Sequence, residues 1–405
     1  MTNPTPPDER QSTSLKVTNE LLDAWATDPK GPVALHLKQE LLPVEGEGGV
    51  IFPPTYADIG YNIDMLSDGT RVATIDSVGS QANRIEPIFK APADAKPEDW
   101  LVPQIMIVLH EKTGEDPYKE KRSILDLAHR SADAVVQSSP TLANDIAKAF
   151  AALKRNGDAG PLCAIAPTSL VFGVWDSRGG TGEKRPRLVR AIIRAWDVEP
   201  LHAAAQFNSV WKALDEDQRA DLEKEAKDKK TKLSEKGLAD APATFRKVGT
   251  TAARYLQEFR DGAPNPERRV LGGVLAKGRI EREVTVNLVA LRGLRGKDTE
   301  ETEHVQKYLL SLSLLAATAD IDLFLREGCH LRYAGEDVWQ SVARRGDPEV
   351  VDLGSAEARN LIRGYASNEA KHFKPRWPEK LEHTFDLKAA RKLLAKKDEE
   401  NSGEE

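Results

Sequence analysis

Cysteine is scarce in this chain, whose 405 residues contain two, Cys163 and Cys329. They form no CxxC pair, and no cluster of histidines lies near either of them. A disulfide framework needs several cysteines, and a structural zinc site needs closely spaced cysteine and histidine ligands. The sequence therefore argues against a fold held together by disulfides and against a structural zinc site.

Catalytic motifs are lacking as well. The eight histidines are widely scattered without an HExxH or His-x-His pair, and neither GxSxG nor GxGxxG occurs. His129 lies at helical spacing from Asp126 and Asp133, but a lone helical histidine is more often a core or capping residue. We therefore expect no enzyme activity, no cofactor and no metal.

No apolar run approaches the roughly 18 residues that a membrane span needs. The first residues, MTNPTPPDERQSTS, have neither the basic nor the apolar block of a secretory signal. We expect a cytoplasmic protein with no membrane partner.

What is present is enough apolar sequence for a large folded body. About 40% of the residues are hydrophobic and 30% are charged, as in globular proteins. The ends at 1–14 and 398–405 are predicted to be disordered tails, which leaves 15–397 as a single body. From Lys212 to Lys236, 16 of 25 residues are charged. This predicts a solvated helical insertion over about 199–262, either touching a neighbour or serving as a linker helix.

Apolar periodicity predicts alternating strands and helices, and hence an α+β fold. Strands are expected at Val33–Val44, Arg71–Ile75, Trp100–Leu109, Ser169–Trp175, Ile280–Leu291 and within Ile321–Tyr333. Helices are expected at Asp76–Glu86, Ser123–Val136, Pro140–Leu153 and Thr299–Ala317. Arg282 interrupts an otherwise apolar strand face, which predicts that this end lies at a sheet margin. Strands and helices with basic rims suit a ferredoxin-like or RRM-type sheet.

The charge is unevenly distributed. The net charge is −6, yet Arg178–Arg194 holds six bases and one acid, and Arg268–Lys297 holds eight bases and two acids. The acidic tail offsets part of this excess, with five acids and no base. Local positive surface suits a nucleic-acid binder, although ordinary solvated faces would have the same composition.

The sharpest motif is WDSRGGTGEKRPRLVRAIIR, residues 175–194. Its three closely spaced glycines let backbone N–H groups approach an anionic oxygen, and its arginines supply compensating charge. A Walker loop would need lysine directly after the last glycine, but Glu183 separates Gly182 from Lys184. The motif therefore favours a polyphosphate backbone as the ligand, with a surface hairpin tip as the alternative.

The second motif is DSVGSQANRIE, residues 76–86. Asp76 and Ser77 precede a helix-like stretch as N-cap residues do. Short hydrogen-bonding side chains and one guanidinium then stand at the start of the expected helix, at Ser77, Ser80, Gln81, Asn83 and Arg84. A helix N-terminus binds phosphate through its free N–H groups and its dipole. A capped helix with an exposed polar face is the alternative.

Four blocks carry a resemblance to a known family. DSVGSQANRIEP, LAHRSADAVVQSS, SLVFGVWDSRGGTGEKRPRLVRAIIRAWDV and KLSEKGLADAP occur in this order. Together they closely resemble the backbone subunit of type I-G (formerly I-U) CRISPR Cascade, in the RAMP superfamily. The resemblance runs from about Ala34 to about Tyr333, and the C-terminal quarter carries no recognised motif.

The resemblance implies an RRM-like palm with finger and thumb insertions, and a non-catalytic subunit of a prokaryotic antiviral complex. It implies head-to-tail copies along a CRISPR RNA, target DNA in the assembled complex, other Cascade subunits and a helicase-nuclease. Guide-RNA binding is expected to avoid base readout. The predicted RNA-binding residues are Ser77, Ser80, Gln81, Asn83, Arg84, Arg178, Gly179, Gly180, Lys184, Arg185, Arg187, Arg190, Arg194, Lys277, Arg279 and Arg282.

Two other functions remain open at this point. Type III relatives of such subunits cut target RNA with an aspartate, and Asp76 or Asp176 beside the basic segments could act likewise. A nucleotide-dependent metabolic enzyme built on the glycine-rich loop is the third hypothesis.

Overall fold

A computed structural model describes residues 14–56, 60–112, 118–175, 184–202, 214–228 and 271–393. The acidic tail and most of the charged insertion lie outside these ranges, as do residues 1–13. Within the insertion, α8 (Glu216–Asp228) is helical as expected.

The described residues form a mixed fold around a ten-stranded sheet, which confirms the α+β prediction. The strand order is β1-β19-β18-β2-β15-β12-β7-β6, and β17 also pairs with β2 and with β16. The strands are β1 (Leu15–Lys16), β19 (Glu349–Asp352), β18 (Trp339–Val342), β2 (Ala34–Pro43), β15 (Ile280–Asn287), β12 (Val189–Trp196), β7 (Arg71–Asp76), β6 (Ile63–Met65), β16 (Phe324–Arg326) and β17 (Cys329–Tyr333).

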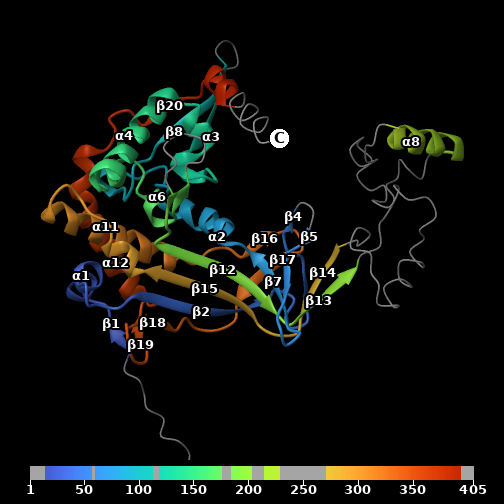
Figure 1. Ribbon diagram of the computed structural model, residues 1–405, viewed down its shortest axis with the longest axis horizontal. Coiled ribbons are helices and arrows are strands. Elements are labelled where there is room, and N and C mark those ends of the chain that lie inside the picture. The colour runs from blue at the N-terminus through green and yellow to red at the C-terminus, as the bar shows by residue number, and fades with distance from the viewer. Residues whose placement is uncertain are drawn as a thin grey trace, which may run out of the picture.

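One face of this sheet is covered by helices (Figure 1). They include α1 (Asn19–Thr27), α2 (Val78–Ile85), α10 (Leu288–Arg292), α11 (Thr299–Ala317) and α12 (Ala356–Phe373). Helix α11 has the predicted bounds, because Asp298 accepts the Glu301 N–H as its N-cap (2.8 Å) and Thr318 ends it. Its buried side chains fill the main core against the sheet.

A second apolar cluster lies further along the same face of the sheet. There the β16–β17 hairpin contributes Leu325 and Leu331, Leu323 precedes it, and the sheet contributes Leu41 and Ile280. Beside it, β13 (Val198–His202), β14 (Leu271–Ala276) and β3 (Val50–Ile51) form a small sheet.

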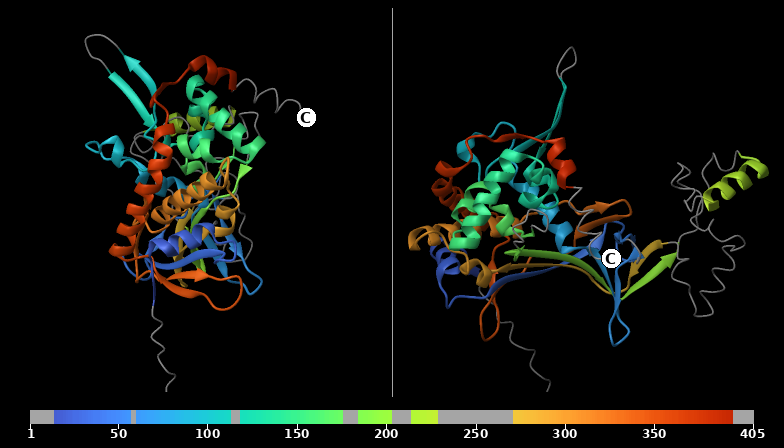
Figure 2. Two further views of the ribbon diagram at one scale, coloured as in Figure 1. Left: turned by 90° about the vertical axis from the view of Figure 1, so that its left-hand side faces the viewer. Right: turned by 45° about the horizontal axis from the view of Figure 1, so that its top comes forward.

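The remaining elements form a helical lobe and a hairpin that projects from the body (Figure 2). The hairpin strands are β8 (Met106–Lys112) and β9 (Tyr118–Ser123), with β20 (Glu382–Thr384) parallel to β8. The lobe contains α3 (Ala134–Gln137), α4 (Pro140–Asn156), α5 (Gly160–Ile165) and α6 (Thr168–Val171). The short pairs are β10 (Val174–Trp175) with β11 (Lys184–Arg185), and β4 (Thr55–Tyr56) with β5 (Gly60–Tyr61).

Several local predictions are wrong in whole or in part. The predicted strand Ile280–Leu291 ends at Asn287, and its last residues belong to helix α10. The predicted strand Trp100–Leu109 begins only at Met106, in β8. Only Val174–Trp175 of the predicted strand Ser169–Trp175 is a strand, whereas Ser169–Val171 belongs to helix α6. A short apolar run buried on all sides has no periodicity to separate the two states. Ser123–Val136 forms two 3-10 turns and the start of α3 rather than one helix. Arg282 lies in the sheet centre, since β15 pairs with both β12 and β2.

A row of polar residues explains why arginine is tolerated at that central position. Asp76 of β7, Arg282 of β15 and Gln39 of β2 are aligned on the helix-covered face, and the apolar Ile193 of β12 lies between Asp76 and Arg282. The row divides the main core from the second cluster. Gln81 of α2 spans it, because its Nε2 donates to Asp76 (2.7 Å) and its Oε1 accepts from Arg282 Nε (2.9 Å).

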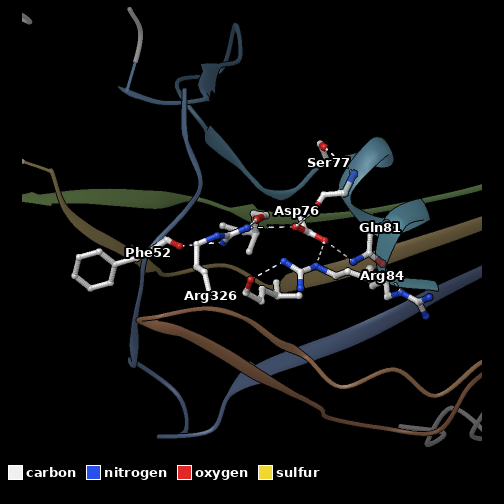
Figure 3. A network of polar contacts seen from close by, with 10 residues as sticks. Phe52, Asp76, Ser77, Gln81, Arg84 and Arg326 are labelled. Atoms are coloured by element: carbon white, nitrogen blue, oxygen red, sulfur yellow. Dashed lines mark hydrogen bonds and ion pairs between the residues drawn. The ribbon is translucent and has the colours of Figure 1, made fainter. Parts of the chain in front are cut away.

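Asp76 is the centre of this network (Figure 3). Its carboxylate is fully buried and accepts from Ser80 Oγ (2.7 Å) and Arg84 Nε (3.0 Å) of α2. Arg326 Nη2 of β16 donates to it as well (3.2 Å). A buried charge needs such partners to offset its desolvation. Asp76 therefore fixes the start of α2 against the sheet and the β16–β17 hairpin.

We predict that Asp76→Asn lowers the free energy of unfolding by about 3–5 kcal/mol, because two arginines lose a buried partner. Chemical denaturation measures this loss. The matched control is Asp64→Asn on neighbouring β6, where the side chain is exposed and the change should stay within about 0.5 kcal/mol. Equal effects of the two substitutions would contradict the role given to Asp76.

Candidate functional site

A cavity of about 330 Å³ opens where the start of β12, the end of β15 and the start of α2 meet. Its walls combine two arginines with two uncharged polar and two aliphatic side chains. The lining residues are Val78, Arg187, Leu188, Arg190, Thr285 and Asn287. We call this cavity the basic pocket.

The strand pairing leaves space for the basic pocket. β7 pairs with β12 only from Ile193 to Trp196, so the first half of β12 has no strand on that side among the described residues. Helix α2 contacts β12, and Val78 in its first turn reaches the pocket. The cavity is therefore bounded by a strand on one side and a helix start on the other.

The chain around Val171–Gly173 packs closely against Arg187 and Leu188, the residues just before β12. The Leu188 N–H donates to the Val171 carbonyl (2.9 Å), which anchors the residues just before β12. Gly173 has φ of +77°, and a Cβ there would lie 2.7 Å from Cγ of Arg187. Only glycine adopts this conformation at low cost and lets the two segments approach this closely.

Arg187 and Arg190 give the pocket its positive charge. Both are exposed, and neither pairs with an acid among the residues that the structure describes. Arg190 lies directly opposite Thr285 on β15, so its guanidinium and the Thr285 hydroxyl belong to the same face of the sheet.

Helix α2 adds the positive end of its dipole to the same place. Ser77 is its N-cap and accepts the Ser80 N–H (3.2 Å). The N–H groups of Val78 and Gly79 precede the first donors of the intrahelical ladder and are available to an acceptor. An anion in the basic pocket would therefore meet two guanidinium groups and the start of a helix.

A buried ion pair links Glu86, directly after α2, to the 3-10 turn Arg130–Ala132. Arg130 Nε lies 2.7 Å from Glu86 Oε2. Arg130 also donates to Asn83 (3.2 Å) and to the Gly173 carbonyl (3.5 Å), and it lies over the ring of Phe172. Its φ of 54° is rare for a residue other than glycine. These contacts hold two walls of the pocket together.

The structure brings three of the predicted binding features together: the start of α2, Arg187 and Arg190. Ser77 caps the helix, while Ser80 and Arg84 hold Asp76, and Asn83 holds Arg130. The second motif therefore builds one wall of the pocket, largely through contacts inside the protein.

Gln81 and Arg282 are buried, with exposures of 0% and 1%. Arg282 Nη1 donates to Gln39 Oε1 (2.6 Å), and Gln39 donates to Asp337 (2.6 Å). Side chains enclosed in this way do not reach a surface ligand, so we leave both out of the interface.

Three further predicted residues are neutralised locally. Arg194 pairs with Glu283 (3.3 Å), Arg279 with Glu281 (2.6 Å) and Lys277 with Glu199 (2.7 Å). The last pair is fully exposed and contributes little to stability. Lys277 and Arg279 also lie before β15, at the opposite end of that strand from the basic pocket.

Part of the glycine-rich motif lies outside the described residues. Arg178, Gly179 and Gly180 lie outside the described residues, as do Asp176 and the side chain of Lys184. The backbone of Lys184 is part of β11, and the Arg185 side chain is half-buried.

Sequence reasoning missed Thr285, Asn287 and Arg130. Thr285 and Asn287 alternate at the polar end of β15, and this signal was present in the strand pattern. Arg130 had no sequence signal, because its importance comes from contacts with residues more than 40 positions away.

The structure offers no obvious metal site within the described ranges. No group of three or more His, Cys, Asp or Glu side chains could hold an ion there. Asp76, on which the endoribonuclease hypothesis partly rested, is enclosed by four hydrogen-bond donors. No described helix is long and apolar enough to cross a membrane.

Glu86, directly after α2, makes the stability of the fold depend on pH. Burial raises the pKa of Glu86 to about 7 from 4.5, although Arg130 acts in the opposite direction. A carboxyl whose pKa is higher in the folded state favours folding while it is protonated. Its contribution is therefore present at low pH and is lost as the pH rises from about 4.5 to about 7.

We predict that Glu86→Gln removes this pH dependence. The wild-type protein should lose about 3 kcal/mol of stability relative to Glu86→Gln between mildly acidic and mildly alkaline pH. Denaturation at a series of pH values measures the difference, with the exposed Glu357→Gln as control. Parallel pH profiles for wild type and Glu86→Gln would show that the Glu86 proton is not held by the fold.

Part of the chain matches the model of a known protein family. Residues 35–200 match the family described as CRISPR-associated protein GSU0053 (Cas_GSU0053). No curated protein matches the chain. The matched segment includes Val78, Arg187 and Arg190 of the basic pocket, whereas Thr285 and Asn287 lie beyond it. From 35 to 200, this chain is therefore similar to a CRISPR-associated protein family.

Proposed function

We propose that this protein is a non-catalytic RNA-binding backbone subunit of a type I-G Cascade complex. The observation that carries the proposal is the basic pocket, where two arginines with no acidic partner among the described residues meet the start of α2. The similarity of residues 35–200 to a CRISPR-associated family supports a role in CRISPR defence.

The chemistry of the pocket suits a phosphate backbone. Guanidinium groups bind phosphate oxygens through paired N–H donors, and a helix start adds further donors and a favourable dipole. Such contacts are the same for every nucleotide, so they hold a strand without selecting its sequence. A guide-RNA subunit needs this property, because base pairing supplies the sequence recognition.

The strand order supports an RRM-like palm. β17-β2-β15-β12 are neighbours, and each adjacent pair is antiparallel. Along the chain, α2 lies between β2 and β12, and α11 lies between β15 and β17. This is the βαββαβ order of ferredoxin-like folds. Residues 86–188 and the charged segment between β13 and β14 are long insertions in that pattern and correspond to the expected finger and thumb.

In the proposed assembly, copies of the chain follow one another along a CRISPR RNA in the cytoplasm. Other Cascade subunits complete the complex, target DNA pairs with the guide, and a helicase-nuclease degrades that DNA. The subunit itself then needs no catalytic group. The net charge of −6 is compatible with this role, because local positive charge at a site matters more for binding a polyanion than the sum over the chain.

The test removes both pocket arginines. Arg187→Ala combined with Arg190→Ala should weaken binding of labelled single-stranded RNA by more than about tenfold, because charged hydrogen bonds to phosphate are lost. The slope of log affinity against log salt should fall in magnitude by about 1.4, or ~0.7 for each lost phosphate contact. Fluorescence anisotropy over a salt series measures both quantities.

The matched control is Lys277→Ala combined with Arg279→Ala. It removes the same formal charge from paired residues at the far end of β15, roughly 24 Å away at about 3.4 Å per residue. We expect a much smaller loss of affinity and little change in salt slope. If the two double variants weaken binding equally, charge alone and not the pocket accounts for RNA binding.

A further inference from the structure

The basic pocket contains more than an anion site requires. Beside the two arginines, Thr285 and Asn287 contribute uncharged hydrogen-bonding groups from alternate positions of β15. Alternate residues of a strand lie on the same face. The pocket is thus charged on the β12 side and neutral but polar on the β15 side.

Asn287 is fixed in one orientation by its neighbour. Its Oδ1 accepts the Ala290 N–H (2.9 Å) as the N-cap of α10. The side-chain amide therefore directs its NH₂ group away from that helix, and this group donates but does not accept. The exposed Asn287 side chain offers the pocket a fixed donor for a neutral oxygen.

Thr285 is fixed as well. Its Oγ1 lies 3.0 Å from Nδ1 of His36 on the adjacent strand. Burial lowers the pKa of His36 below its usual value of 6.5, so the ring is neutral at pH 7. If Nδ1 accepts the hydroxyl proton, the Thr285 oxygen is left to accept another. If Nδ1 donates, the Thr285 O–H is left to donate. One hydrogen-bonding capacity is free in either tautomer.

We propose that the basic pocket binds one ribose-phosphate unit and that Thr285 recognises the ribose 2′-hydroxyl. A hydroxyl both donates and accepts, so it suits Thr285 in either tautomer of His36. The hydrogen atom at the same position of deoxyribose can do neither. Arg187 and Arg190 hold the phosphate, and Asn287 donates to a sugar oxygen. Thr285 thereby makes the site selective for RNA over DNA.

This inference rests on the proposed RNA-binding function and adds the selectivity. A phosphate site alone would leave Thr285 and Asn287 without a role in the pocket. A base-reading site would need groups that distinguish base edges, whereas the remaining lining residues, Val78 and Leu188, are aliphatic. A ribose with its phosphate uses both polar groups and both arginines.

The test compares oligouridylate and oligodeoxyuridylate of equal length, which differ only in the 2′-hydroxyl. Thr285→Val keeps the shape of the side chain and removes the hydroxyl. It should weaken RNA binding about three- to tenfold, the effect of one lost hydrogen bond, and leave DNA binding unchanged. Thr285→Ser retains the hydroxyl and should retain most of the RNA preference.

Thr74→Val serves as the matched control, since Thr74 lies on β7 opposite Arg194 and outside the pocket lining. It should leave both affinities unchanged, and thermal melting checks that every variant is folded. A wild-type RNA preference that survives in Thr285→Val, or equal wild-type affinities for the two oligomers, would overturn the inference while leaving the RNA-binding proposal intact. Failure of the wild type to bind either oligomer would overturn both.

Discussion

The buried carboxylate of Asp76 is the constraint on which the site geometry depends. It lies at the end of β7 with no exposed surface, and its partners come from α2 and from the β16–β17 hairpin. Removing a charge from water is costly unless these donors are all in place. The start of α2 consequently has one position relative to the sheet. Since Val78 in that first turn forms a wall of the basic pocket, a charge inside the core determines the shape of a cavity at the surface.

The distribution of unpaired charge follows from the same arrangement. Arg194 of β12 is neutralised by Glu283 of β15, and Arg279, just before β15, is neutralised by Glu281. Arg187 lies just before β12 and Arg190 lies in its first half, which does not pair with β7. Neither arginine pairs with an acid among the described residues. The pocket is therefore preorganised for an anion: its guanidinium groups do not have to leave an internal partner before they bind a ligand. An acidic protein can bind a polyanion in this way, because the local field at the pocket matters more than the total charge.

The sequence allowed the regular parts of this arrangement to be predicted. Strand β2, helix α11 and the capped start of α2 all follow from periodicity and local capping chemistry. That α2 lies beside Arg187 and Arg190 did not follow from the sequence, where both motifs were only expected to face the same RNA. Arg282 was misjudged because a charged residue in an apolar strand is typical of a margin, whereas here Gln81 and Gln39 satisfy it from positions far away in the sequence. Thr285 was overlooked for the related reason that a single strand pattern does not reveal what the neighbouring strand and helix place beside it.

In the proposed site different residues bind the phosphate and the sugar, and this affects which nucleic acid the pocket selects. Contacts to phosphate are common to RNA and DNA, so arginines alone would bind either strand. Base contacts would distinguish RNA from DNA poorly and would also restrict the sequences that the subunit accepts. The sugar is the part of the chain that differs between the two nucleic acids and is identical in every nucleotide. A hydroxyl partner on the rigid strand β15, held by His36 and opposite Arg190, is thus where selectivity for RNA can be obtained without selectivity for sequence.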